Sequence, residues 1–403
     1  MQSANAPARV EDEASWRGLV ERRLTTVLDP MVYRAGEIFL RGRSGRAIGN
    51  APAVPLDEAR AWDFLDKNLL SLGFFFDALI LNERLPIFNY GDTFDMHLNF
   101  EERSFAVFND ADHPVIEPVD VGWGAYMPIK QEALAALRAT LEGRGAQGGP
   151  WLPAGEARSI LDELSHVEFQ WDIAMGPELD ALLPSEADRR LGRFLLGGMI
   201  FGKYADRMQS EHWLQPKRAR LFVQATTGGA APGRDDEMKL FEWLAKTYNL
   251  PALSTWQPTF LHLLLERAKT LRDFPAIVRD LRRSGPVRDY RAWRTQAMHE
   301  WRRDGGLTRD TLKTLERLKA ALAAPGISLG AATDAGVAIV ETVVKQSPDS
   351  AAKAVGKALP LFGWVLDKVP GRRHVKLLAD SAHARGRYPH IERRVRSLWD
   401  SAQ

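Results

Sequence analysis

Residues 56–81 read LDEARAWDFLDKNLLSLGFFFDALIL. The first half of this stretch carries charged residues at helical spacing, and the second half, from Leu69 on, is apolar at nearly every position except Asp77. A helix that is apolar on all its sides belongs in a protein interior. The stretch therefore predicts one long helix that is buried in the centre of the N-terminal half, and with it a mainly α fold.

Helical periodicity continues on both sides of this stretch. An amphipathic helix is predicted over 16–28. Further helices are predicted over 131–142, 155–169, 185–208, 235–248, 260–271, 274–283, 286–303, 308–323, 332–346, 350–366 and 390–399.

Strand character is confined to one region that follows the long helix. Short runs with partial alternation occur at 86–90, 96–100, 104–108 and 115–121, and Asn, Asp, Gly and Pro separate them. Such runs are typical of short strands joined by turns. We expect a small antiparallel β insertion over 86–121.

A chain of 403 residues is too long for one ordinary core, so two domains are expected. Gly- and Pro-rich breaks occur at 142–153 and 226–233. We place the boundary at the second break. The predicted organisation is a disordered lead-in at 1–14, an N-terminal α domain at 15–225 that contains the β insertion, and a basic C-terminal helical domain at 234–403.

Composition excludes several classes of protein. The chain has no cysteine, which rules out disulfides, cysteine-ligated metals and a thiol nucleophile. It has no uncharged apolar run of 18 residues and no apolar signal segment at its start, so we expect a cytoplasmic protein without an integral membrane segment. Gly143, Gly145 and Gly148 spell GxGxxG, but they follow a predicted helix and run into Pro150, so no cofactor is expected.

Charge is unevenly distributed although the net charge is only +2. Residues 57–120 contain 14 acidic and 4 basic residues, whereas residues 267–319 contain 15 basic and 7 acidic residues. This asymmetry indicates an anionic partner for the C-terminal half, or two halves that attract each other.

Arginines and aromatic residues alternate in the basic region. Arginines can hold phosphates and aromatic rings can stack on bases, so the region is a candidate nucleic-acid-binding surface. The alternative is a solvated helix whose indoles pack inward. The candidate residues are Arg282, Arg283, Arg288, Arg291, Arg302 and Arg303, with Tyr290, Trp293 and Trp301 among them.

The pattern Arg-x4-His occurs at Arg207–His212, Arg294–His299 and Arg385–His390. An imidazole can move the proton of an RNA 2′-hydroxyl while a guanidinium holds the scissile phosphate. The pattern resembles the RxxxxH signature of the HEPN ribonucleases, a helical dimeric family common in toxin and antiviral systems. The resemblance implies metal-independent RNA cleavage, with Arg294 and His299 as the candidate catalytic residues because they lie in a predicted helix within the basic region.

Two further patterns have structural and functional interpretations. Asp77 in its apolar helix is either a functional buried acid or a member of a structural polar seam. Glu163 and His166 form one ExxH pair, whereas helical di-iron proteins use two, so an ordinary helix face is favoured and no metal is expected.

The sequence leaves two function classes open. The first is a nucleic-acid-associated protein, extending to a metal-independent ribonuclease of a multi-gene toxin or antiviral system. The second is a non-enzymatic interaction subunit that docks other proteins of a complex or a second copy of itself. The Arg- and Ala-rich composition without cofactor motifs is common among bacterial accessory components of such systems, and no family is recognised across the whole chain.

Overall fold

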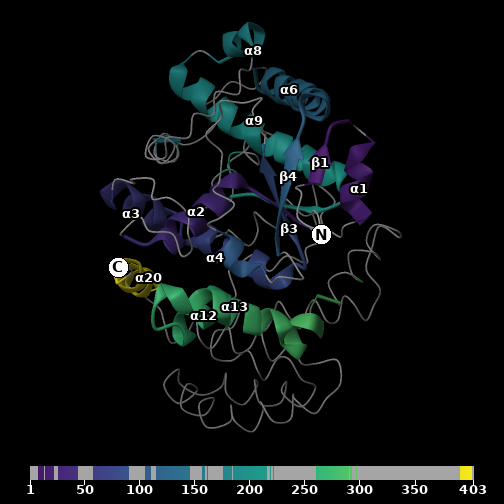
Figure 1. The fold of residues 1–403 in the computed structure, drawn as a ribbon. Helices are drawn as coiled ribbons and strands as arrows, with labels where there is room; N and C mark the ends of the chain where they lie inside the picture. Colours follow the sequence, from purple (N-terminus) through teal and green to yellow (C-terminus); the bar gives the residue numbers. More distant parts are fainter. Residues whose placement is uncertain are drawn as a thin grey trace, which may run out of the picture. The chain divides into compact units, whose positions relative to one another are not determined.

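Helices form most of the secondary structure in the computed structural model (Figure 1), which confirms the predicted mainly α class. The structure describes residues 8–12, 14–21, 26–43, 58–89, 105–109, 115–145, 157–158, 161, 176–183, 185–215, 218, 221, 260–289, 291–292, 296 and 391–401. The chain divides into two compact units, which we call unit 1 (Met1–Leu250 with Ala402–Gln403) and unit 2 (Pro251–Ser401). The predicted boundary at 226–233 lies outside the described residues and stays a prediction.

Unit 1 combines short strands with longer helices. Its strands are β1 (Ala8–Val10), β2 (Thr26–Leu28), β3 (Leu85–Asn89), β4 (Ile116–Val121) and β5 (Glu211–Trp213). Its helices are α1 (Ser15–Glu21), α2 (Pro30–Arg41), α3 (Glu58–Lys67), α4 (Leu69–Leu81), the 3-10 turn η2 (Ala106–Phe108), α6 (Trp123–Gly145), α8 (Pro177–Ala181) and α9 (Glu186–Arg207).

The described strands pair in parallel, so the predicted antiparallel insertion over 86–121 is wrong. Strand β4 lies between β1 and β3, with Val119 opposite both Ala8 and Phe88. Strands β2 and β5 form a second parallel pair, in register from Thr26↔Glu211 to Leu28↔Trp213. Parallel neighbours need a long return connection instead of a tight turn, and strands far apart in sequence can supply the partner.

The β3 and β4 segments were located correctly, but three neighbouring predictions were not. Residues 8–10 fall in the expected disordered lead-in and form β1, because alternate residues there are buried against β4. The helix predicted over 16–28 ends at Glu21, and its last residues form β2. The strand predicted over 104–108 contains the 3-10 turn η2 instead. The run at 96–100 lies outside the described residues.

The stretch 56–81 forms two helices that meet at Asn68. The backbone of Asn68 has φ −124° and ψ 27°, outside the helical range. The side-chain amide of Asn68 donates to Phe64 O at 2.9 Å. An asparagine can replace a backbone partner in this way and so end a helix. Beyond it, every residue from Ser71 to Leu81 is buried, which confirms the central position of this helix.

Helices α2 and α4 pack closely because Gly36 has no side chain. A Cβ built on Gly36 would lie 2.4 Å from the Cδ1 atom of Phe75, so the ring occupies the space that any side chain would need. Phe75 also contacts Tyr33 of α2 edge-on, with ring centroids 6.3 Å apart. Both helices are buried almost completely as a result.

Helix α9 packs against α6 and against both strands of the β2–β5 pair (Figure 1). It begins where predicted, because the Ser185 hydroxyl accepts from Asp188 N at 3.0 Å and caps the helix. Its apolar face contributes to a cluster of aromatic rings. The ring centroid of Tyr204 lies 5.0 Å from that of Trp16 and 4.9 Å from that of Phe88. This cluster links α1, β3 and α9.

Unit 2 is described through α12 (Phe260–Arg267), the 3-10 turn η4 (Leu271–Asp273), α13 (Phe274–Arg283) and α20 (Ile391–Asp400). Helix α20 packs against α12, and Arg394 donates to the carbonyls of Leu265 and Ala268. A guanidinium there satisfies carbonyls at the end of α12. Helix α20 is thereby attached to a segment 126 residues earlier in the sequence.

None of the helices in these described ranges has the length and apolar character that a membrane crossing requires.

The α2–α4 contact gives a first prediction. Replacing Gly36 with Ala should destabilise the protein by about 1–3 kcal/mol, because the methyl group overpacks against Phe75. Gly18→Ala is the matched control, since Gly18 is also helical but has nothing within 4 Å of its added Cβ. That change should be neutral or stabilising by up to about 1 kcal/mol. Urea denaturation of both variants measures the difference, and equal midpoints would contradict the close packing.

Candidate functional site

The basic region predicted to bind nucleic acid is partly described, and it begins with α13. Asp273 precedes this helix and accepts hydrogen bonds from the backbone N–H groups of Thr270 and Lys269, both at 2.8 Å. These bonds, that of Thr270 first, hold the pKa of Asp273 below its usual value. The acidic group is therefore committed to the start of the 3-10 turn η4, which precedes the helix.

The apolar and basic residues of α13 lie on different sides of the helix. Phe274, Val278 and Leu281 are buried, whereas Arg283 is exposed and Arg279 and Arg282 are half-buried. Arg282 and Arg283 lie in the last turn, where the helix dipole favours positive charge. The helix therefore presents its arginines at its C-terminal end.

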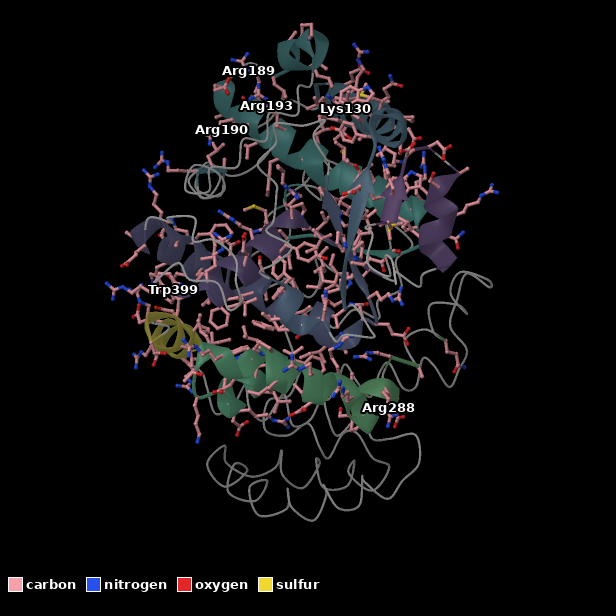
Figure 2. All side chains as sticks on the ribbon, viewed as in Figure 1. Lys130, Arg189, Arg190, Arg193, Arg288 and Trp399 are labelled. Carbon is pink, nitrogen blue, oxygen red and sulfur yellow. The ribbon has the colours of Figure 1, made fainter. Side chains whose placement is uncertain are left out.

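Ser284 joins α13 to a second helical segment that begins at residue 285. Its hydroxyl donates to Leu281 O at 2.7 Å, and its carbonyl accepts from Arg288 N at 3.1 Å. Arg283 and Arg288 therefore lie within about one helical turn on either side of Ser284. Arg288 (Figure 2) is exposed. Its neighbour Val287 is buried. We call Arg279, Arg282 and Arg283 of α13, together with Arg288 of the next segment, the arginine face.

The structure describes only part of the predicted nucleic-acid site. Arg282, Arg283 and Arg288 belong to the arginine face, and Arg291 is half-buried in the helical segment that follows. Arg302 and Arg303 lie outside the described residues, as do the predicted catalytic residues Arg294 and His299.

Arg207 and His212 form the Arg-x4-His pair that the structure describes, and it places their side chains against different elements. Arg207, at the end of α9, binds both carboxylate oxygens of Glu132 on α6, at 2.5 and 3.4 Å. His212 lies on β5, and its Nδ1 atom is 3.3 Å from the position of a Cβ built on Gly202. Both residues make structural contacts. Arg385 and His390 lie outside the described residues.

His212 is held as a neutral imidazole. Its Nε2 atom is buried without a hydrogen-bond partner in the described part of the chain, although the residue keeps some exposed surface. Burial first, and then the positive charge of Arg218, lower the pKa of His212 to about 3.

Asp77 is fully buried on α4, as the apolar sequence around it predicts. A second buried acid lies on the neighbouring helix α2, where Glu37 pairs with Arg41 at 2.7 Å and with Arg34 at 2.6 Å. Each of the two packed helices α2 and α4 therefore carries a buried acidic residue. The functional role of Asp77 stays a prediction. Glu163 and His166 lie outside the described residues.

Sequence patterns did not indicate a buried ion pair between Asp29 and Arg218. Asp29 follows β2, and its Oδ2 atom accepts from Arg218 Nη1 at 2.6 Å. Both side chains are 0% exposed, and the guanidinium carbon lies 4.1 Å from the ring centre of Phe194. Burial lowers the pKa of Arg218, and the charge of Asp29 opposes that effect.

Further hydrogen bonds connect this ion pair to three segments of unit 1. Asp29 also accepts from Met31 N and Gln215 N, and the Gln215 side chain bonds Asn68 at 3.1 Å and Arg218 N at 2.8 Å. The one available sequence signal was Asp29 followed by Pro30, which is typical of a helix start. Because these groups are enclosed and bind one another, their role is structural.

In the described residues, no group of three or more His, Asp and Glu side chains could hold a metal ion. The chain matches no protein-family model, no curated protein and no solved structure.

The buried pair gives a second prediction. Arg218→Met should destabilise unit 1 by about 3–5 kcal/mol, because it leaves the Asp29 carboxylate buried without its cation. Arg189→Met is the control. Arg189 pairs with Glu186 at the surface of α9 (Figure 2), and its loss should cost less than about 1 kcal/mol.

Chemical denaturation measures both changes. The double variant Asp29→Asn with Arg218→Met should recover part of the loss, because it removes both charges together. Equal effects of the Arg218 and Arg189 substitutions would contradict a structural role for the buried pair.

Proposed function

We propose that this protein associates with nucleic acid and that the arginine face of unit 2 contacts the phosphates. The observation that supports the proposal is the division of α13, which buries Phe274, Val278 and Leu281 and directs its arginines to its polar side. Arginine suits this role because its planar guanidinium can donate two parallel hydrogen bonds to one phosphate.

The distribution of charge favours a polymer over a small anion. The arginine face extends over 279–288, from the last turns of α13 across Ser284 into the next helical segment. Residues 260–289 contain seven basic and four acidic residues, and one of the acids, Asp273, precedes α13 and binds the backbone N–H groups of Lys269 and Thr270. The sequence continues with further arginines up to Arg303, and Trp293 and Trp301 lie between them. Repeated cations with aromatic residues between them suit successive phosphates and bases.

A third prediction tests this contact. Arg282→Gln with Arg283→Gln should weaken binding of fluorescent RNA and DNA oligonucleotides roughly tenfold at moderate salt. The plot of log affinity against log salt should become shallower by about 1.4–1.8, because two phosphate contacts are lost. Fluorescence anisotropy over a salt series measures both quantities.

The control is Arg189→Gln with Arg190→Gln, on α9 of unit 1 (Figure 2). This pair also consists of two adjacent arginines near a helix end and causes the same change in net charge. It should leave affinity and salt slope unchanged. Wild-type binding that is absent at low salt, or insensitive to salt, would remove the proposal and favour the interaction-subunit function.

The finer proposal is that the protein cleaves RNA without a metal ion, within a bacterial toxin or antiviral system. It rests on the sequence pattern Arg294–His299, since both residues lie outside the described part of the chain. Side chains five residues apart on a helix diverge by about 140°, so a second helix, such as one from another copy of the chain, would complete a cleft around them.

A fourth prediction follows from that pattern. The protein should cleave RNA in the presence of a chelator and leave cyclic phosphate ends. His299→Ala should abolish cleavage while RNA binding persists, because the imidazole moves the proton and the arginines hold the strand. Arg294→Ala should impair both. Gel analysis of labelled RNA with end-group identification measures the outcome, and binding without cleavage would leave a nucleic-acid-binding protein that is not a ribonuclease.

A further inference from the structure

Helix α20 places further cations beside the end of α12, close to where the η4–α13 stretch begins. It lies against α12 (Figure 1), and the Arg394 guanidinium donates to the carbonyl of Ala268. Arg267 and Lys269 flank Ala268 in the sequence. Arg393 directly precedes Arg394. Two segments that are 126 residues apart therefore bring their basic residues to one place. We call Arg267, Lys269 and Arg393 the junction cations.

The junction cations are exposed and exceed the acidic residues around them. Residues 266–273 and 392–394 together contain five basic and three acidic residues. One of the acids, Asp273, is bound by the backbone N–H groups of Lys269 and Thr270. Arg267 and Arg393 take part in no ion pair within the described part of the chain. Positive charge therefore remains available at this point of unit 2.

A stripe of arginines connects the junction cations with the arginine face. The 3-10 turn η4 runs directly into α13, because the backbone at 273–274 keeps right-handed helical angles. Residues that are four, seven and eleven positions apart lie on the same side of a helix. Arg272, Ala276, Arg279 and Arg283 have this spacing. Arg279 is half-buried and the other three are exposed, so the stripe faces outward.

The stripe has the length of a short nucleic-acid segment. From Arg272 to Arg283 it extends over 11 positions, which at 1.5 Å for each residue is about 16 Å. A stacked strand rises about 3.4 Å for each nucleotide, so about five nucleotides cover this distance. Asp280 is exposed at one edge of the stripe and does not interrupt the line of arginines.

We propose that the arginine face is one end of a longer track, on which a single nucleic-acid strand follows the stripe and ends on the junction cations. This inference rests on the proposed function and adds to it the path and the minimum length of the bound strand. Cations spaced along a line can each hold a different phosphate of one polymer, whereas a small anion would occupy one end alone.

A fifth prediction compares two lengths of strand. Lys269→Gln with Arg393→Gln should weaken binding of a strand of about twelve nucleotides roughly tenfold at moderate salt. The plot of log affinity against log salt should become shallower by about 1.4–1.8. Affinity for a strand of about four nucleotides should change by at most about twofold, because so short a strand cannot reach both ends and still has the arginine face. Competition against the fluorescent longer strand measures both lengths.

Two further double variants complete the design. Arg267→Gln with Arg393→Gln also removes one junction cation from each segment and should reproduce the result, which guards against one variant failing to fold. Arg189→Gln with Arg190→Gln, on α9 of unit 1, makes the same change in net charge and should leave both lengths unaffected.

The outcomes separate the track from the proposed function. If the variant of Arg282 and Arg283 weakens binding but both junction variants leave the longer strand unaffected, the track is wrong and the proposed function stands. Equal weakening of both lengths by the junction variants would also overturn the track, because it would show a general effect of charge. If the wild-type protein binds neither length at low salt, the proposed function and the track fail together.

Discussion

The ion pair between Asp29 and Arg218 is the contact on which the arrangement of unit 1 depends. Two opposite charges that are both 0% exposed stabilise a fold only when each finds the other and the remaining polar atoms are hydrogen-bonded. Asp29 meets this requirement by binding Arg218, Gln215 N and Met31 N at once. Those bonds hold together the end of β2, the start of α2 and the residues that follow β5.

The hydrogen bonds around this ion pair also position the neighbouring elements. Gln215 also bonds Asn68, the residue that ends α3 and begins α4, so the break in the long apolar stretch is part of the buried network. Helix α4 then packs against α2 at Gly36, while α9 packs against His212 of β5 at Gly202 and against Arg218 through Phe194. Small residues and enclosed charges together fix distances that apolar contacts alone would leave adjustable.

Charge serves two different purposes in the two units. In unit 1, Asp29, Glu37, Arg41, Asp77 and Arg218 are enclosed, and their contribution is to structure. In unit 2, three arginines of the arginine face lie on the polar side of α13, whose apolar side is buried, and Arg288 is exposed on the segment that follows. Enclosed charges cannot reach a polyanion, so the proposed nucleic-acid contact uses the arginine face and not these residues.

The sequence by itself determined the features that depend on neighbours along the chain. Helical periodicity located α9 and α13, and the apolar run after Leu69 predicted the buried centre with Asp77 inside it. The spacing of arginines predicted a basic site, which stays a prediction. Only the tertiary structure decided that the strands are parallel, that residues 8–10 join them, and that Asp29 binds a residue 189 positions away. A strand's alternation and a carboxylate's charge are local properties, whereas their partners are chosen by which distant segments can be buried together without leaving a polar group unpaired.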